Sequence, residues 1–246
     1  MPQLNSYDVL TDISTQDGMF EGDLNHYFSV GHSALRCIEL AAQAAGRACF
    51  HSILDFGCGF GRVLRVLKAA YPEAVLAGCD LSQEALDFCA TAFGAERFYS
   101  NEDPDKVTID RTFDLIWCGT MLTNIDSAPF IRFLQLFNSL LSRDGLLVFT
   151  THGPFVADRI RTGEYSYGLD EAYIPAMLRA YESAGFGYTD YPAEVLSRVG
   201  VEKYGISISK PSWVCRQIEA IPDLRVMMYT ERAWDNHQDC VACSQW

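Results

Sequence analysis

The 246-residue sequence lacks the features that would place it in a membrane or on a nucleic acid. It has no run of 18 apolar residues, and its first residues, MPQLNSYDVL, contain neither the basic nor the apolar part of a signal peptide. Basic residues are also scarce, since 19 Lys and Arg face 32 Asp and Glu and leave a formal net charge of -13. Phosphate backbones and anionic lipids repel so acidic a chain. We therefore expect a cytoplasmic protein with no nucleic-acid or membrane partner.

Nine cysteines are present, but they lack the pattern of a disulfide framework or a metal site. Their number is odd and most lie within apolar runs, which is typical of buried thiols in a reducing compartment. Cys240 and Cys243 form a C-x-x-C within a strand-like segment, where side chains three residues apart point to opposite faces. No second C-x-x-C completes a set of four zinc ligands. We therefore expect no bound metal.

The chain has no internal repeat, low-complexity tract or long linker, which predicts one continuous domain. Short apolar segments alternate with helix-like segments between residues 33 and 151. The predicted strands are SILDF, AVLAGC, ERFYS, FDLIWC and LLVFTT, and the predicted helices cover 33–46, 62–71, 82–93 and 128–141. Such alternation requires right-handed crossovers and predicts a parallel sheet covered by helices on both faces.

The two ends of the chain depart from this alternation. Residues 1–30 are polar and are expected to be irregular. Residues 153–210 contain predicted helices at PFVADRIR and DEAYIPAMLRAYESAG and predicted strands at FGYTDY and YGISIS. They also contain six tyrosines from Tyr165 to Tyr191, and an insertion of this length is typical of a lid or binding element. The final segments, LRVMMYTERAW and DNHQDCVACS, have no helix between them and predict an antiparallel hairpin at the sheet edge.

The stretch LDFGCGFGRVL, residues 54–64, places three glycines where a strand must turn into a helix. Glycine allows positive φ and lets a ligand approach the backbone near a helix N-terminus, although a plain strand-to-helix turn is the alternative. Asp80 ends the next strand, 21 residues after Gly59. An acidic residue there can accept hydrogen bonds from both ribose hydroxyls of a nucleoside cofactor. Helix capping is the other role for Asp80, but Ser82 already fills it.

The spacing of the glycines distinguishes between two nucleoside cofactors. Dinucleotides use G-x-G-x-x-G, whereas Gly57, Gly59 and Gly61 form G-x-G-x-G. Asp55 lies directly before the turn, where a carboxylate is unfavourable beside a pyrophosphate but suits an ammonium group. S-adenosylmethionine has an ammonium and a sulfonium and no phosphate. The pattern therefore favours S-adenosylmethionine and methyl transfer over NAD-dependent oxidation.

In these residues the sequence resembles class I S-adenosylmethionine-dependent methyltransferases. ILDFGCGFGRVL resembles their first motif, AGCDLSQEAL the second, FDLIWCGTMLTNID the fourth-strand segment and GLLVFTTHG the fifth strand. The sequence is also similar to a group of uncharacterised bacterial methyltransferases with WCG-x-LLT, VFTTHG and a terminal WDNHQD. Their fourth-strand segment often reads LLTHLD, where this chain has Asn124.

The resemblance implies an α/β fold, Rossmann-like and doubly wound, with a seven-stranded sheet that is mostly parallel and ends in an antiparallel C-terminal hairpin strand. It implies one methyltransferase domain over residues 1–246, with a cofactor-covering segment at 1–46 and a lid-like insertion at about 153–210. It also implies a set of cofactor contacts that spans the glycine turn, the ends of the next strands and the first helix. These are Tyr27, Gly31, Ser33, Asp55, Gly57, Cys58, Gly59, Asp80, Leu81, Ser100, Asn101, Cys118 and Gly119.

The predicted topology brings two histidines to one edge of the sheet. His152 follows the fifth strand, and His237 precedes the last strand, which runs antiparallel to it. We expect both to face the cofactor pocket, one of them as the base that takes a proton from the acceptor. The expected acceptor-binding residues are Met121, Asn124, Asp235, Asn236 and Asp239. Hydrogen bonds that merely tie the strand ends together are the alternative for these side chains.

The expected function is transfer of a methyl group from S-adenosylmethionine to a hydroxyl of a small molecule or saccharide. Two alternatives remain at this point. One is a non-catalytic subunit that binds S-adenosylmethionine, and the other, disfavoured by the glycine spacing, is an NAD-dependent oxidoreductase.

Overall fold

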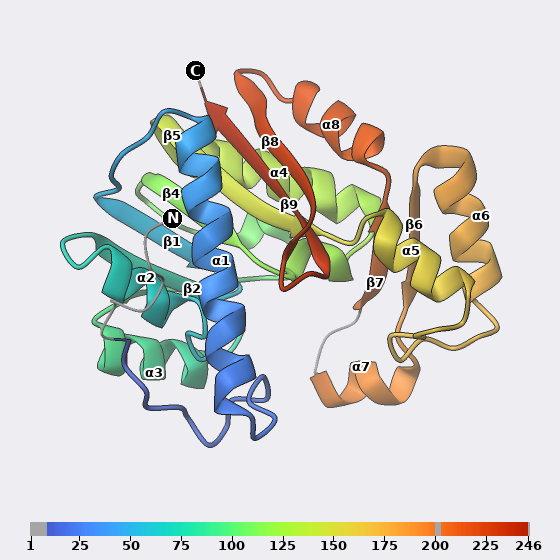
Figure 1. The fold of residues 1–246 in the computed structure, drawn as a ribbon, viewed down its shortest axis with the longest axis horizontal. Helices are drawn as coiled ribbons and strands as arrows, with labels where there is room; N and C mark the ends of the chain where they lie inside the picture. The colour runs from blue at the N-terminus through green and yellow to red at the C-terminus, as the bar shows by residue number, and fades with distance from the viewer. Residues whose placement is uncertain (1–8, 200–202, 246) are drawn as a thin grey trace.

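A seven-stranded sheet forms the centre of the computed structural model, which describes residues 9–199 and 203–245 (Figure 1). Its strand order is β3-β2-β1-β4-β5-β9-β8, and only β9 runs antiparallel to the other strands. The strands are β1 (Ser52–Phe56), β2 (Val75–Asp80), β3 (Glu96–Tyr99), β4 (Phe113–Cys118), β5 (Leu141–Thr151), β8 (Leu224–Trp234) and β9 (Gln238–Gln245). This confirms the predicted fold class and the C-terminal hairpin.

Helices cover both faces of the sheet because successive strand residues point to opposite sides. Ile53 packs with α1 (Leu24–Ala44), α2 (Leu64–Ala70) and α3 (Gln83–Phe93). The next residue, Leu54, packs with α4 (Ser127–Leu140) and α8 (Pro211–Glu219) on the other side. None of the helices in the described ranges combines the length and apolarity needed to cross a bilayer.

Several elements of the described chain differ from the sequence-based expectations. Residues 1–30 were expected to be irregular, but α1 begins at Leu24, where the Asp23 carboxylate accepts hydrogen bonds from the backbone N–H groups of Asn25 and His26 at 2.9 and 3.1 Å. Residues 1–8 of that segment lie outside the described part of the chain. The fifth strand begins at Leu141, before the Asp144–Gly145 turn, and its pairing with β4 is irregular there. Helix α8 was not predicted at all.

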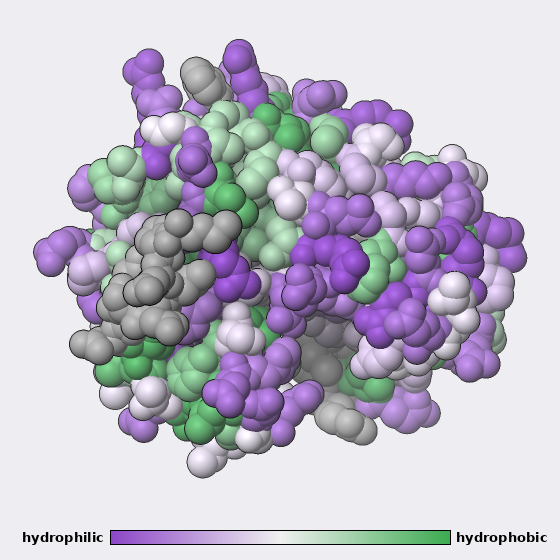
Figure 2. All heavy atoms as spheres, in the orientation of Figure 1, coloured by the Kyte–Doolittle hydropathy of each residue, from purple (hydrophilic) through white to green (hydrophobic). Residues whose placement is uncertain are grey.

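The insertion after β5 has an apolar cluster of its own, which includes Val156, Met177 and Ile208. It consists of α5 (Pro154–Arg161), α6 (Ile174–Ala184), β6 (Phe186–Asp190), α7 (Ala193–Val199) and β7 (Gly205–Ser209). Strands β6 and β7 form a separate antiparallel pair beside the main sheet (Figure 1). Helix α6 starts at Ile174, four residues after the predicted start at Asp170. The surface over α5 and α6 is mostly hydrophilic (Figure 2).

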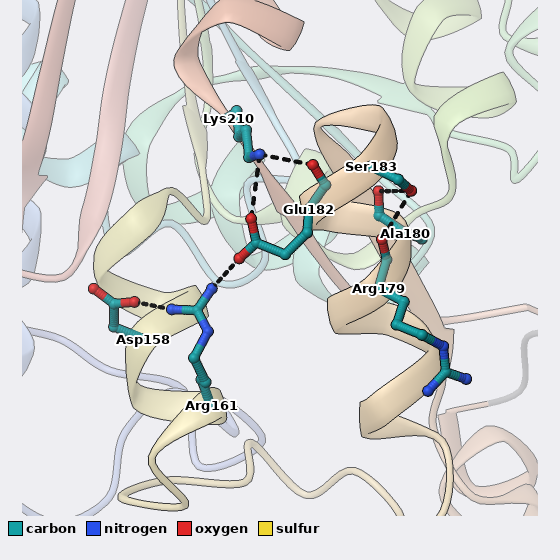
Figure 3. A network of polar contacts seen from close by, with 7 residues as sticks. All are labelled: Asp158, Arg161, Arg179, Ala180, Glu182, Ser183 and Lys210. Carbon is teal, nitrogen blue, oxygen red and sulfur yellow. Dashed lines mark hydrogen bonds and ion pairs between the residues drawn. The ribbon is translucent and has the colours of Figure 1, made fainter.

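Exposed polar contacts join the helices of the insertion to the start of α8 (Figure 3). Arg161 on α5 forms ion pairs with Asp158 and with Glu182 on α6. The Lys210 ammonium donates to the Glu182 carbonyl at 2.9 Å and lies 3.4 Å from its carboxylate. Exposed pairs of this kind each contribute about 0–1 kcal/mol, so the apolar cluster stabilises the insertion more than this network does.

Gly31 should be sensitive to substitution because α1 crosses very close to the turn before α2. A Cβ atom at this position would lie 2.6 Å from the Arg62 carbonyl oxygen. Glycine to alanine normally stabilises a helix interior by about 1 kcal/mol. We predict that Gly31→Ala instead lowers the free energy of unfolding by about 1–3 kcal/mol, measured by urea denaturation. Ser29→Ala, at an exposed position of the same helix, should change it by less than about 0.5 kcal/mol. A stabilised Gly31→Ala variant would contradict the close packing.

Candidate functional site

A cavity of about 740 Å³ lies at the carboxyl ends of the parallel strands. Its walls come from the glycine turn after β1, the ends of β2, β3 and β4, the segment before α1, the start of α4 and the β6–β7 pair. Ligands of open α/β sheets bind at this edge, outside the carboxyl ends of the strands. The volume is that of a typical small-molecule site.

The glycine turn presents its backbone to the cavity. Gly57 and Gly59 have φ values of 79° and 49°, and Gly57 N–H donates to the Cys79 carbonyl at 2.7 Å. A Cβ atom on Gly59 would meet no atom within 4 Å, so the space beside it is open. Gly61 has a different role, because its Cβ atom would lie 2.5 Å from the Phe93 ring. The first two glycines thus leave room for a ligand, and the third allows α3 to pack closely.

Asp80 holds the turn and also lines the cavity. One carboxylate oxygen accepts from Gly59 N–H at 2.8 Å, and the other accepts from Ser82 N–H at 2.9 Å. Ser82 caps α3 through its bond from Ala85 N–H, as predicted. Leu81, next to Asp80, leaves 55% of its surface exposed, which gives the cavity wall an apolar patch.

Asp55 is a buried residue of the cavity wall, and one of its carboxyl oxygens lacks a hydrogen-bond partner among the described residues. The side chain is 2% exposed, and the oxygen without a partner is Oδ2. Burial and the neighbouring charge of Asp80 raise the pKa of the Asp55 carboxyl to about 8, against the opposing effects of Arg62 and the Leu64 N–H. The buried Oδ2 atom is therefore available to a hydrogen-bond donor from a ligand in the cavity.

A cation lies on the same side of the cavity. Arg62 follows the glycine turn, lines the cavity and is within electrostatic range of Asp17 and Asp55. Burial lowers the pKa of its guanidinium, although these neighbouring carboxylates oppose the shift. The wall around the turn therefore offers one carboxyl oxygen without a partner, Asp55 Oδ2, and the half-buried cation of Arg62.

The segment before α1 covers the cavity through residues that the sequence analysis did not single out. Asp17 and Met19 line it, and the Tyr27 hydroxyl fixes Asp17 by donating to its carboxylate at 2.6 Å. Arg65, which is 1% exposed, donates to the carbonyls of Leu10 and Asp12 at 3.0 and 2.8 Å. Arg65 thus anchors the segment to α2.

Nine of the thirteen expected cofactor residues line the cavity: Asp55, Gly57, Cys58, Gly59, Asp80, Leu81, Ser100, Asn101 and Gly119. The other four do not. Tyr27 acts through Asp17, Gly31 packs on Arg62, and Cys118 is fully buried. The Ser33 hydroxyl accepts from Asp235 N–H at 2.9 Å and so fastens α1 to the β8–β9 turn.

The two predicted catalytic histidines lie together, but neither lines the cavity. Their ring centroids are 5.7 Å apart, and Tyr167 and Phe155 of the insertion pack against them. His152 is 4% exposed, and its Nδ1 atom has no hydrogen-bond partner in the part of the chain that the structure describes. Burial, and then the neighbouring His237, lower the pKa of His152 to about 3, so this imidazole is neutral. Burial and Arg159 lower the pKa of His237 as well.

Of the expected acceptor-binding residues, only Met121 lines the cavity. The Asn124 amide donates to the Thr120 carbonyl at 2.8 Å and supports the short 3-10 helix Met121–Asn124. Asp239 accepts from the Tyr229 hydroxyl at 2.7 Å and from Arg232 N–H at 3.0 Å. Asp235 and Asn236, both with φ of 53°, form the hairpin turn. These contacts tie strand ends together, the alternative that the sequence left open.

The sequence analysis missed the part of the cavity wall that comes from α4 and the insertion. This part is formed by Ile125, Asp126, Ala128, Pro129 and Phe133 around the start of α4, and by Tyr188, Asp190, Lys203 and Tyr204 of the insertion. Its only signal in the sequence was the group of tyrosines in the insertion. Tyr188 does line the cavity, whereas Tyr165 and Tyr173 are exposed elsewhere. Trp117 and Trp234, packed edge to face, were also missed as cavity residues.

Residues 54–147 match the model of a family of methyltransferase domains. Solved structures with a similar fold include an S-adenosylmethionine-dependent methyltransferase from Clostridium acetobutylicum (15% identity, TM-score 0.58, 87% of this chain and 91% of that chain). A second is the amino pentose methyltransferase CalS10 from Micromonospora echinaspora (13% identity, TM-score 0.58, 88% of this chain and 92% of that chain). A third is DesVI from Streptomyces venezuelae (13% identity, TM-score 0.58, 91% of this chain and 94% of that chain). No curated protein sequence matches the chain significantly. The domain match and the fold confirm the expected enzyme class and its cofactor, S-adenosylmethionine.

The raised pKa of Asp55 predicts a specific dependence of stability on pH. Its folded-state value of about 8 lies above the usual 3.9 of an unfolded Asp, so the folded state binds the extra proton between these values. This group therefore lowers the free energy of unfolding progressively as the pH rises from about 4 to 8. Asp55→Asn removes that effect. We predict that the variant exceeds wild type by about 1–3 kcal/mol at pH 8 and by less at pH 5, measured by urea denaturation.

Asp110→Asn is the matched control, because it makes the same change of charge at an exposed position away from the cavity. It should leave the difference between pH 5 and pH 8 as in wild type. A constant difference between Asp55→Asn and wild type across this range would show that Asp55 is ionised in the free protein.

Proposed function

We propose that this chain, an S-adenosylmethionine-dependent methyltransferase by its domain and its fold, methylates a small molecule, with a hydroxyl of a compound such as a saccharide as the acceptor group. The observation that supports a small-molecule acceptor is the continuity of the cavity. One end lies on the glycine turn, and the other lies between the start of α4 and the insertion. A cofactor bound at the first end leaves the second end for an acceptor.

The residues at the first end fit the chemical groups of S-adenosylmethionine. The unpartnered, buried Asp55 carboxyl suits the ammonium group, and Arg62 suits the carboxylate. Asp80 retains acceptor capacity for the ribose hydroxyls, while the exposed side chain of Leu81 offers an apolar surface to the adenine. The cofactor supplies a methyl group activated by a sulfonium, and the main task of the protein is to align the acceptor with it.

The second end of the cavity determines how a proton can leave the acceptor. No histidine lines the cavity in the described residues, and His152 is both buried and neutral. Asp126 and Asp190 are the carboxylates at this end. We therefore assign the removal of the proton to this carboxylate-lined end, and we assign His152 and His237 to the packing of the insertion against the sheet edge.

The alternative of a non-catalytic binding subunit is less consistent with this geometry. A protein that only bound the cofactor would not need the second end, which brings together two elements distant in sequence, α4 and the β6–β7 pair. NAD-dependent oxidation is disfavoured by Asp55, because a carboxyl at the glycine turn would lie beside a pyrophosphate.

Thermal unfolding with S-adenosylhomocysteine tests the proposed cofactor site. At 100 times the dissociation constant, a ligand stabilises a protein by about 2.7 kcal/mol, which raises Tm by roughly 5–10 °C for a chain of this size. We expect this rise with S-adenosylhomocysteine and none with NADH. Asp80→Ala should abolish the rise, and Asp110→Asn should retain it. A rise with NADH alone would overturn the proposal.

Proton release on binding tests the role of Asp55. With a pKa of about 8 the carboxyl is mostly protonated at pH 7, and it must ionise to pair with the ammonium group. We predict that binding of S-adenosylhomocysteine at pH 7 releases close to one proton, measured by calorimetry in buffers with different enthalpies of ionisation. Asp55→Asn should bind at least about tenfold more weakly and release none. Equal proton release by the variant would show that another group ionises.

A further inference from the structure

The turn that follows β4 has a backbone conformation that a threonine rarely adopts. Thr120 has φ 69° and ψ -35°, and Met121 N–H donates to the Gly119 carbonyl across it at 2.8 Å. This is a γ-turn of the rare and strained form. A β-branched residue at positive φ is an outlier, and such outliers cluster at active sites and ligand-binding sites. Thr120 also lines the cavity.

Buried polar neighbours hold Thr120 in this conformation. Its N–H donates to Thr150 Oγ1 at 2.8 Å, and its carbonyl accepts from Asn124 Nδ2 at 2.8 Å and from Thr123 N–H at 2.9 Å. Thr150 and Asn124 are 0% and 4% exposed, so these polar side chains are buried where they serve the turn. A strained conformation persists only when the surrounding structure fixes it in this way.

The same contacts fix the direction in which the Thr120 hydroxyl donates. A backbone N–H can only donate, so Thr150 Oγ1 accepts from Thr120 and sends its own proton to Gln238 Oε1, at 2.6 Å. The Gln238 amide is thereby oriented with its Nε2 group towards Thr120 Oγ1, at 3.4 Å. Among the described residues, the hydroxyl accepts this hydrogen bond and donates none. Its proton is therefore available to a ligand in the cavity.

The hydroxyl lies on the side of the sheet edge away from the proposed ammonium and ribose contacts. Asp55 and Asp80 belong to β1 and β2, whereas the turn that contains Thr120 follows β4, and its side-chain partners Thr150 and Gln238 belong to β5 and β9. The turn nevertheless adjoins the glycine turn.

The contact between the two turns is close. A Cβ atom on Gly57 would lie 3.6 Å from the Met121 Cβ atom. A ligand that accepts a hydrogen bond from Thr120 therefore lies beside a cofactor bound at the glycine turn. A methyl acceptor must occupy such a position, because methyl transfer requires it to be aligned with the cofactor.

We propose that Thr120 recognises the methyl acceptor by donating a hydrogen bond to one of its oxygen atoms, and that Thr150 and Gln238 are positioning residues that keep this proton directed into the cavity. This rests on the proposed function and specifies what the acceptor presents to the turn. That group is an oxygen with a free lone pair, as in an ether, a carbonyl or a hydroxyl. An acceptor whose polar groups only donate, such as an alkylammonium, does not match the turn.

Cyclohexanone is a suitable probe because its only polar atom is an oxygen that accepts hydrogen bonds. Methylenecyclohexane has nearly the same shape without that oxygen and serves as the matched control ligand. Each is titrated into the full chain saturated with S-adenosylhomocysteine and isotope-labelled in its threonine methyl groups. The NMR signals of Thr120 and its neighbour Thr123 report binding at the turn, and we expect cyclohexanone to shift both. The Thr123 signal remains as the reporter in variants of Thr120.

Variants test the direction of the hydrogen bond. Thr120→Val keeps the shape of the side chain without its donor and should weaken cyclohexanone binding by about five- to tenfold, with that of methylenecyclohexane unchanged. Thr120→Ser retains the donor and should bind cyclohexanone within about twofold of wild type. Thr91→Val, at an exposed position of α3, is the control for Thr120→Val and should bind both probes as wild type does.

Gln238→Glu tests the positioning role. At pH 8 an ionised carboxylate can only accept, so it takes a hydrogen bond from Thr150 and another from Thr120 and turns the Thr120 proton away from the cavity. This variant should lose cyclohexanone affinity as Thr120→Val does and keep its affinity for methylenecyclohexane. A residue with a merely structural role would change both affinities alike.

The outcomes separate this inference from the proposed function. The affinity for S-adenosylhomocysteine, measured first for every variant, should stay at the wild-type value and thereby verify folding. Equal binding of cyclohexanone by wild type and Thr120→Val, unchanged binding by Gln238→Glu, or no response of the two threonine signals in wild type would overturn the role of Thr120 and leave the methyltransferase assignment standing. Failure of the wild-type chain to bind S-adenosylhomocysteine would overturn the proposed function itself.

Discussion

The buried carboxyl of Asp55, at the point where β1 turns into α2, is the constraint on which the site depends. Its position follows from the alternation along β1, and its burial follows from the helices that cover the sheet. With its Oδ2 atom unpaired among the described residues and its pKa raised to about 8, it makes the free protein less stable as the pH rises towards 8. The proposed ammonium group of a ligand would offset this cost on binding.

The cavity is divided between two parts of the fold. The sheet edge supplies the glycine turn and Asp80, and these residues are rigid because backbone bonds from Gly57 and Gly59 hold them. The insertion supplies Tyr188 and Asp190 from β6, and Phe186 and Tyr188 of this strand pack with the same apolar cluster as α4 and α8. The cavity wall that β6 contributes is therefore fixed by the main core, whereas Val156, Met177 and Ile208 form a separate cluster within the insertion.

The histidine pair shows what topology alone can and cannot predict. The antiparallel pairing of β5 with β9 places Thr151 opposite Asp239, and this brings the neighbouring His152 and His237 together. That convergence follows from strand direction and was predictable. Whether the imidazoles face the cavity depends on α5 and Tyr167, which pack over them. No local sequence pattern predicts how the insertion packs against the sheet.

The sequence by itself determined the alternation of strands and helices, the glycine turn and the cap of α3, because these depend on local rules: the period of two in strands, positive φ at Gly57 and Gly59, and the Ser82 cap. Only the tertiary structure decided which residues before α1 line the cavity and that Asp55 is buried. It also decided that the start of α4 and the insertion line the same cavity. Asp17, Asp126 and Asp190 lie far apart in the chain and carry no motif. They meet through packing between distant elements, and packing of that kind leaves no periodic signal in a sequence.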